Sequence, residues 1–405
     1  QVGPAAIGFR TESYLMREAH NEGELIPKRV ERAYVPYQGA IVLKPTPGLH
    51  EDVIAFDFKS MYPTLMVAYN ISPDTYVDPR EKIPKEQTYI APEVGHRFRK
   101  LPQGLYPKVL IKLMQAREEI RQKMREPRTE THEYSLLDAR QRAVKLITNA
   151  TYGYAGWTGA RWYLRPVAEA VAAYGRQIIT RTIQLAESMG LEVIYGDTDS
   201  LFIKMKLDKA EEFQKKIEAE LGLEIRPEEV YLRIYFTEAK KRYAGLLHDG
   251  SVNIVGLEVA RGDWSEVAKK TQEEVLRILL CEKSVEQAVK YVKKRIIELR
   301  SGKTSLEDLV IWKTLTKPPE EYEVKAPHVE AARRLIEGGW TVTAGDKVGF
   351  VIKKGAGKLY DRAVPYIFAS TADIDLTYYE KQQVLPAVLR ILEPFKVTEA
   401  MLVPD

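Results

Sequence analysis

The sequence of 405 residues has a single cysteine, Cys281, which excludes a disulfide framework and a cysteine-rich zinc site. We expect no signal peptide, and no apolar run approaches the roughly 18 to 20 residues of a membrane span. Charge of neither sign dominates, since 61 Lys and Arg against 57 Asp and Glu leave a net charge of +4. With 45% hydrophobic residues, the composition is typical of a globular protein that tolerates a polyanionic partner without requiring one.

The length predicts two to three domains, at roughly 150 residues each. Because the chain begins at Gln1 inside sequence typical of a folded region, we expect a piece of a longer protein or the product of a split gene. A nearly continuous apolar run predicts a buried strand at Val53–Phe58, and many prolines and glycines predict a loop-rich segment at 71–108. A domain boundary is expected near Gly262.

Two helices joined by a short turn, a helical hairpin, are predicted at 109–125 and 130–152, with Pro127 ending the first. The pattern further predicts a strand, an acidic turn and a strand at 192–204. The other expected elements are helices at 11–22, 164–189, 208–221, 265–281, 284–300 and 381–394 and a strand at 229–236.

An aspartate, Asp57, lies at the end of the first predicted strand, in the segment DFKSMYP (57–63). A carboxylate there loses water and stays ionised only if a cation neutralises it. The alternative is an aspartate that caps the next turn, and the segment taken alone is more typical of such a cap.

Two further carboxylates, Asp197 and Asp199, lie in the turn of YGDTDS (195–200). So close together, they are costly unless a divalent cation lies between them, and hard oxygen ligands of this kind suit magnesium. A plain solvated turn is the alternative.

A third segment, KLITNATYG (145–153), carries Lys145, Asn149, Tyr152 and Gly153 at i, i+4, i+7 and i+8. These residues share one helix face, which offers a cation, an amide, an aromatic ring and a gap. Such a face can bind a phosphate and stack a base. An amphipathic helix with a solvated lysine has the same pattern.

Together the three segments resemble DNA polymerase family B, its archaeal branch in particular. DFKSMYP is similar to motif A of that family, KLITNATYG to motif B and YGDTDS to motif C, in the same order. Other segments similar to the family are YQGAIVLKPTPGLH (37–50), KKRYAG (240–245), GLEVARGDWSEVAKKTQ (256–272), KAPHVEAARRL (325–335) and DKVGFVIKKG (346–355). The resemblance spans nearly the whole chain.

The resemblance implies an α+β fold shaped as a right hand, with an antiparallel palm sheet backed by helices, helical-hairpin fingers and a mostly helical thumb. The expected parts are a first palm segment at 1–108, fingers at 109–154, a second palm segment at 155–262 and the thumb at 263–405.

The implied activity is DNA-templated DNA synthesis, in which a primer 3′-hydroxyl attacks the α-phosphate of a deoxynucleoside triphosphate. The family resemblance implies two Mg²⁺ ions, for which Mn²⁺ can substitute, held by Asp57, Asp199 and the backbone carbonyl of Phe58, with Asp197 beside them. It also implies Lys145 as a catalytic residue that donates a proton to the leaving pyrophosphate.

The same resemblance implies contacts with the nucleotide and with primer–template DNA. The Tyr62 ring would select deoxyribose by clashing with a 2′-hydroxyl. The residues expected at the nucleotide are Ser60, Met61, Tyr62, Arg117, Arg121, Lys145, Asn149 and Tyr152. Those expected at DNA are Gly153, Thr198, Lys240, Lys241, Arg242 and Tyr243, mostly through phosphate contacts that position DNA without reading its sequence.

Some features depart from the family pattern. Lys59 stands where a small or neutral residue is common and adds a charge near the site, whereas Gly262 stands where a second arginine is common and weakens one DNA-backbone contact. Nothing ahead of the expected palm resembles the Asp-x-Glu exonuclease motif. YSLLD (134–138) fits the Tyr-x-x-x-Asp pattern of the exonuclease, but it lies on an expected finger helix between motifs A and B, so we interpret the match as a coincidence. We therefore expect no proofreading from this chain, with a separate subunit carrying the N-terminal and exonuclease domains as another source of it.

No clamp-binding tail is evident after Pro404, which leaves binding to a sliding clamp undecided. We expect a cytoplasmic, nucleoid-associated protein with no membrane partner. Two other functions compete with the polymerase: a catalytically inactive, DNA-binding structural subunit and a two-metal nuclease. The intact Asp57, Asp197, Asp199 and Lys145 argue against the first, and the triphosphate-binding face of 117–153 has no purpose in the second.

Overall fold

The computed structural model describes residues 4–125 and 131–404 and forms two compact units. Unit 1 comprises residues 1–43 and 55–228, and unit 2 comprises residues 44–54 and 229–405. Helices and antiparallel sheets both contribute, as expected for the predicted α+β class. The division into palm, fingers and thumb stays a prediction, because each unit combines parts of it.

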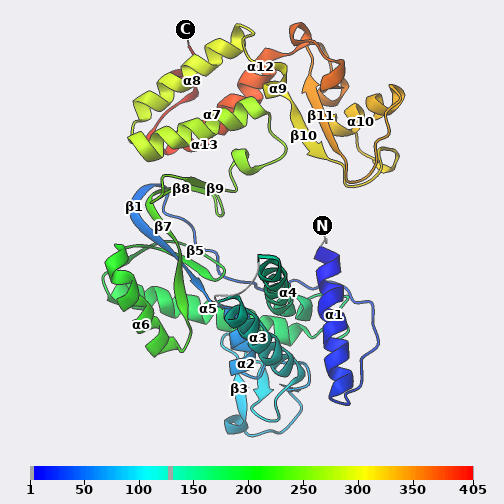
Figure 1. Ribbon diagram of the computed structural model, residues 1–405, viewed down its shortest axis with the longest axis vertical. Coiled ribbons are helices and arrows are strands. Elements are labelled where there is room, and N and C mark those ends of the chain that lie inside the picture. Colours follow the sequence, from blue (N-terminus) through cyan, green and yellow to red (C-terminus); the bar gives the residue numbers. More distant parts are fainter. Residues whose placement is uncertain (1–3, 126–130, 405) are drawn as a thin grey trace. The chain divides into compact units, whose positions relative to one another are not determined.

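Unit 1 has helices around one end of a sheet with the strand order β5-β6-β1-β7 (Figure 1). Its helices are α1 (Pro4–Asn21), α2 (Met61–Ala68), α3 (Leu105–Met124), α4 (Thr131–Ala155), α5 (Arg165–Ser188) and α6 (Ala210–Leu221). Its sheet strands are β1 (Gly48–Phe58), β5 (Glu192–Asp197), β6 (Ser200–Lys204) and β7 (Ile225–Phe236), of which β1 and β7 belong partly to unit 2.

The strand β1 is fixed by its apolar run. Val53 to Phe56 are all buried, as expected for a strand covered on both faces. The predicted strand at Val53–Phe58 is confirmed, and the structure extends it back to Gly48. In the next strand pair, Asp197 lies opposite Ser200, so a turn of two residues joins β5 to β6.

The helices α3 and α4 lie side by side, as predicted for a helical hairpin (Figure 1). The first turns of α3 bury apolar residues such as Leu110 and Leu113, whereas its second half carries Arg117 and Arg121 on partly exposed turns. The predicted break at Pro127 and the predicted start at residue 130 lie outside the described residues.

The segment predicted to be loop-rich, 71–108, also holds a small sheet of order β2-β4-β3. Its strands are β2 (Tyr76–Val77), β3 (Thr88–Ile90) and β4 (Arg97–Arg99). Strands this short show no alternation in the sequence that could predict them.

Unit 2 continues the large sheet with the order β1-β7-β8-β9 and adds a second sheet of order β10-β11-β12. Its further strands are β8 (Tyr243–Leu247), β9 (Val252–Val255), β10 (Ile311–Thr314), β11 (Lys347–Ile352) and β12 (Ala363–Pro365). Its helices are α7 (Glu266–Arg277), α8 (Val285–Arg300), α9 (Leu306–Leu309), α10 (Pro327–Glu337), α11 (Leu359–Arg362), α12 (Leu376–Tyr378), α13 (Leu385–Leu392) and α14 (Glu399–Leu402).

Two hydrophobic clusters form the core of unit 2. One surrounds β11 and α10, and the other joins α7, α8 and α13 to Tyr235 and Ala244 of the large sheet. The sequence predicts α7, α8 and α13 but not the sheet β10-β11-β12, whose strands are short and separated by prolines and glycines. Among the described residues, no helix has both the length and the apolar character of a membrane span.

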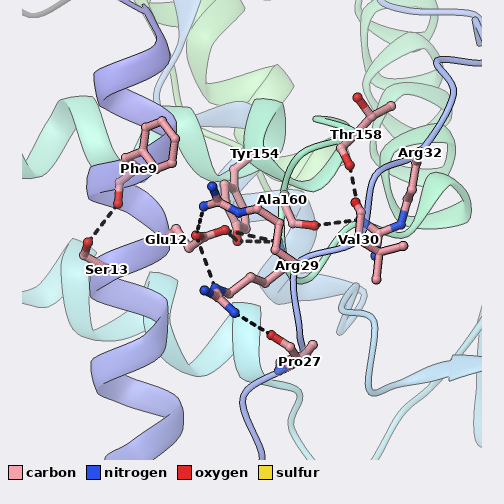
Figure 2. A network of polar contacts seen from close by, with 11 residues as sticks. Phe9, Glu12, Ser13, Pro27, Arg29, Val30, Arg32, Tyr154, Thr158 and Ala160 are labelled. Atoms are coloured by element: carbon pink, nitrogen blue, oxygen red, sulfur yellow. Dashed lines mark hydrogen bonds and ion pairs between the residues drawn. The ribbon is translucent and has the colours of Figure 1, made fainter.

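A buried carboxylate joins α1 to the end of α4 (Figure 2). Glu12 is only 3% exposed and accepts hydrogen bonds from the Tyr154 hydroxyl at 2.8 Å, the Arg161 backbone N–H at 3.1 Å and the Arg29 guanidinium. The guanidinium of Arg29 also lies over the Phe9 ring, 4.8 Å from its centroid. Burial alone would raise the pKa of Glu12, but these hydrogen bonds and the Arg29 charge hold it below its ordinary value.

Removing this carboxylate should therefore destabilise unit 1. We expect Glu12→Ala to cost about 2–3 kcal/mol, less than the roughly 3–5 kcal/mol of a fully buried pair, because its arginine partners keep contact with water. Urea denaturation combined with hydrogen exchange of α1 and α4 amides measures the effect.

The matched control is Glu211→Ala, which removes an exposed pair with Lys215 on α6 and should cost less than about 0.5 kcal/mol. If both variants lose the same stability, the Glu12 network contributes nothing beyond an ordinary surface pair.

Candidate active site

Two of the predicted catalytic carboxylates, Asp57 and Asp199, meet because β1 and β6 are neighbours in the sheet. The Phe58 backbone N–H donates to the Asp199 carbonyl oxygen at 3.1 Å, and the Ser200 hydroxyl donates to Asp57 Oδ1 at 3.2 Å. Segments separated by about 140 residues of sequence are thus tied together at the end of β1. The main-chain hydrogen bond therefore fixes the backbone positions from which the two carboxylates project.

The turn that carries Asp199 is held in an uncommon conformation. Thr198 has a positive φ of 61°, which is rare for a β-branched residue. Such strain persists where surrounding bonds fix the backbone. Here the Thr198 N–H donates to the Ile41 carbonyl oxygen at 3.0 Å, and the Leu43 N–H donates to the Gly196 carbonyl oxygen at 2.9 Å. The segment 41–43 therefore stabilises the acidic turn through these two backbone hydrogen bonds.

The carboxylates make this end of the sheet strongly acidic. Burial raises the pKa of Asp57 to about 6, with further contributions from the charges of Asp199 and Glu228. Burial also raises the pKa of Asp199, and the charges of Asp197 and Glu228 add to the effect. Two ionised carboxylates in this position require a cation, and their oxygen atoms are the ligands that magnesium prefers.

The described residues contain no group of three or more His, Cys, Asp or Glu side chains arranged to hold a metal ion. The donors available at the sheet end are the carboxylates of Asp57 and Asp199 and the backbone carbonyl of Phe58, with Glu228 nearby. The chemistry of this set fits hard divalent cations, because every donor is an oxygen atom and burial of the Asp57 carboxylate, which raises its pKa to about 6, makes a neutralising cation favourable.

A wall of cations faces the carboxylates from α3 and α4. Arg117, on α3, donates from Nε to Gln141 Oε1 at 3.3 Å, and burial together with the charge of Arg121 lowers its pKa. Arg121 makes a long contact of 3.9 Å with Glu118. Lys145 and Arg117 form no ion pair with any carboxylate in the described part of the chain. These charges remain available for an anion.

Two aromatic rings lie beside the wall. Tyr62 on α2 and Tyr152 on α4 are stacked, with ring centroids 4.6 Å apart and planes at 15°. Glycine allows α5 to approach the ring, since a Cβ at Gly175 would lie 2.8 Å from Tyr62 Cε1. The buried Tyr62 hydroxyl has no hydrogen-bond partner among the described residues. The ring itself is thus held by packing, and its hydroxyl contributes no bond.

One cavity of about 550 Å³, here called the catalytic cavity, collects most of the predicted residues of unit 1. The predicted residues that line it are Asp57, Phe58, Ser60, Met61, Tyr62, Arg117, Arg121, Lys145, Asn149, Tyr152, Thr198 and Asp199. Asp197 and Gly153 adjoin this set in sequence but are not part of the lining.

The four other predicted residues, Lys240 to Tyr243, belong to unit 2, in which the first three connect β7 to β8 and Tyr243 begins β8. Their turn is closed by the Thr237 N–H, which donates to the Arg242 carbonyl oxygen at 3.2 Å. Lys241 has a positive φ of 62°, and its carbonyl oxygen would lie 1.9 Å from a Cβ at Gly256, so only glycine fits there.

Sequence reasoning missed three residues of the cavity lining: Arg226, Pro227 and Glu228. They lie on β7, which reaches the carboxylates only through the sheet, and no local motif marks them. The acidic pair Glu228-Glu229 at the start of the predicted strand 229–236 was the one available signal.

Comparisons with known proteins show the family of the chain. The family model described as DNA polymerase family B matches residues 6–395. The chain is 52% identical over 402 residues to DNA polymerase 2 of Aeropyrum pernix, covering 99% of this chain and 50% of that protein. It is 44% identical over 414 residues to a DNA polymerase of Archaeoglobus fulgidus, covering 98% and 52%.

A solved structure gives the same result. The family B DNA polymerase from the hyperthermophilic archaeon Pyrobaculum calidifontis matches with a TM-score of 0.78 and 49% identity, over 97% of this chain and 52% of that one. The chain therefore spans about half the length of these relatives. The matches confirm the predicted α+β fold and the resemblance drawn from motifs A, B and C, and the chain belongs to DNA polymerase family B.

Proposed function

We propose that the chain is the core of a DNA-templated DNA polymerase, which adds deoxynucleotides to a primer 3′-hydroxyl. The observation that carries the proposal is the catalytic cavity, in which Asp57 and Asp199 lie opposite Arg117, Arg121 and Lys145. Acidic residues alone would suit many metal-dependent enzymes. Facing cations suit a substrate with several negative charges, such as a nucleoside triphosphate, and among the described residues Arg117 and Lys145 have no carboxylate in an ion pair.

The acidic side of the cavity would hold the metal ions. Asp57, Asp199 and the Phe58 carbonyl oxygen would hold two Mg²⁺ ions, which would supply Lewis-acid activation of the primer 3′-hydroxyl and offset charge on the triphosphate. Mn²⁺ would fit the same oxygen ligands. Asp197, outside the cavity lining, would support the acidic turn and add to its field.

The cationic side would hold and orient the triphosphate. Arg117 and Arg121 offer planar forks for phosphate oxygens, and Lys145 offers a point charge. Lys145 would also donate the proton that the leaving pyrophosphate takes up. Ser60 precedes α2 with a positive φ of 52°, Met61 begins that helix, and both would contact the phosphates at the cavity.

The aromatic side of the cavity, formed by Tyr62 and Tyr152, would discriminate between sugars and contact the nascent base pair. The Tyr62 ring, held between Gly175 and Tyr152, would clash with a 2′-hydroxyl. Asn149 and Tyr152 would lie against the nascent base pair. The residues proposed to contact primer–template DNA are Gly153, Thr198, Lys240, Lys241, Arg242 and Tyr243.

A catalytically inactive DNA-binding subunit is the second candidate, and the carboxylates and cations of the catalytic cavity argue against it. A nuclease would leave the cationic wall without a substrate group to bind. We further propose that the chain acts in synthesis rather than primer degradation, and that any proofreading comes from residues beyond these 405.

Changing Asp199 to Asn removes a charged metal ligand with little change in shape. We expect primer extension to fall at least about 100-fold, which corresponds to ~2.7 kcal/mol of transition-state stabilisation. A labelled primer–template with four deoxynucleotides and Mg²⁺ measures the rate, and EDTA should abolish it in the unaltered chain. DNA binding that persists in Asp199→Asn shows that the variant is folded. Extension at the unaltered rate would contradict the proposed role.

Lys145→Met should lower kcat by roughly 100-fold and raise KM for the nucleotide, because both a proton donor and a phosphate contact are lost. Steady-state single-nucleotide incorporation separates the two constants. Lys145→Arg keeps the charge but has a much higher pKa, so it should recover KM more than kcat. Equal recovery of both constants would argue against proton donation.

Tyr62→Ala should raise ribonucleotide incorporation relative to deoxyribonucleotide incorporation by roughly 10-fold or more. Tyr62→Phe is the matched control: the hydroxyl has no partner, so the ring alone should preserve selection. The ratio of kcat/KM for the two nucleotides measures the effect. A loss of selection in Tyr62→Phe would mean that the hydroxyl, rather than the ring, discriminates.

A further inference from the structure

The cationic wall of unit 1 faces a second cavity as well as the catalytic one. This side cavity, of about 510 Å³, shares Lys59, Ser60, Arg117, Arg121, Lys145 and Asn149 with the catalytic cavity. It contains neither Asp57 nor Asp199. Its far side comes from the end of α6 and the turn that follows, at Glu218, Gly222, Leu223 and Glu224. The same cations are therefore accessible from two sides.

Lys59 lies where the two cavities meet. Its Nζ forms an ion pair with Glu224 Oε2 at 2.9 Å, and its backbone N–H donates to the Glu224 carbonyl oxygen at 3.0 Å. Glu224 lines only the side cavity, whereas Lys59 lines both. The function proposed above gives Lys59 no role, although the sequence marks it as an added charge.

The ion pair of Lys59 can open at little cost. The two side chains are 39% and 35% exposed, and pairs with this much solvent contact contribute little to stability. Arg226 also forms an ion pair with Glu224. When Lys59 turns to another anion, Glu224 therefore keeps one cationic partner and still contributes negative charge to the side cavity.

The proposed reaction produces an anion that has to leave by some route. As the primer oxygen bonds to the α-phosphorus, the bond between that phosphorus and the bridging oxygen breaks, and pyrophosphate departs with several negative charges. It starts against Arg117, Arg121 and Lys145, which also line the side cavity. Acidic residues of the side cavity, Glu118, Glu218 and Glu224, disfavour lasting binding of an anion there.

We propose that the side cavity is a release site for inorganic pyrophosphate, and that Lys59 transfers the anion into it by exchanging Glu224 for a phosphate oxygen. The inference rests on the proposed polymerase function and adds a ligand site that the catalytic cavity does not include. Cations shared by both cavities give the anion a continuous path, and the carboxylates of the side cavity keep its stay short.

The test uses the full chain and measures pyrophosphate directly. In pyrophosphorolysis, pyrophosphate attacks the terminal phosphodiester of the primer and releases a deoxynucleoside triphosphate, which distinguishes this reaction from hydrolysis. We expect Lys59→Met to raise the apparent Kd for pyrophosphate at least fivefold, with a smaller change, under twofold, in KM for the nucleotide. Lys59→Arg should restore pyrophosphate binding.

Two further variants sharpen the outcome. Glu224→Gln removes a repelling charge from the side cavity and should tighten pyrophosphate binding. Lys216→Met, which breaks a similar half-exposed pair with Glu220 on α6, should change neither constant. A Lys59→Met variant whose Kd for pyrophosphate stays within twofold, or whose Kd and KM rise equally, would overturn the proposal.

Calorimetric titration of the chain with pyrophosphate, without DNA, separates this inference from the proposed function. If the unaltered chain extends no primer, the polymerase proposal fails, and calorimetry still decides whether Lys59 holds pyrophosphate. If the chain extends primers and Lys59→Met binds pyrophosphate as tightly as the unaltered chain, only the release site fails.

Discussion

Two carboxylates of like charge, Asp57 and Asp199, are held close together in partly buried positions, and the rest of unit 1 is arranged around that repulsion. Their burial and mutual charge raise the pKa of Asp57, so the folded chain holds them together against an electrostatic cost. Two sets of backbone hydrogen bonds restrain the carboxylates: the bond from Phe58 to Asp199, and the bonds between segment 41–43 and the acidic turn. These restraints hold the two carboxylates in position without a bound cation.

The opposite wall depends on the anchoring of a helix pair. The α4 helix carries Lys145 and Tyr152 toward the catalytic cavity, and its last turn is tied to α1 through Tyr154 and Glu12. Lys145 and Tyr152 lie on the same helix as Tyr154, so the anchored last turn restrains the part of α4 that carries them. Different interactions therefore hold the two sides of the catalytic cavity. Main-chain hydrogen bonds hold the carboxylates, and the buried network around Glu12 holds the helix that carries Lys145.

Local sequence patterns were enough to predict part of the candidate site. The run that ends at Asp57 and the turn that carries Asp199 are marked by apolar strands, so their place in the fold could be predicted from neighbouring residues. Glu228 could not, because it reaches the site only through the pairing of β7 with β1, which leaves no trace in local sequence. Glu12 lies in an ordinary amphipathic helix, and nothing in its surroundings indicates that distant partners will bury it. Strand pairing and burial that depend on residues distant in the sequence could therefore not be predicted from local patterns.

The sharing of β1 and β7 between the units has a consequence for dissecting the molecule. Unit 2 takes residues 44–54 from a part of the chain far from the 229–405 segment that makes up the rest of it. A polypeptide cut at Glu229 would leave β7 without its neighbour β1 and expose a row of unpaired backbone groups. Such an open edge invites aggregation. The two units therefore cannot be separated by a single cut of the chain, and an insertion or fusion at residues 44–54 would disturb both.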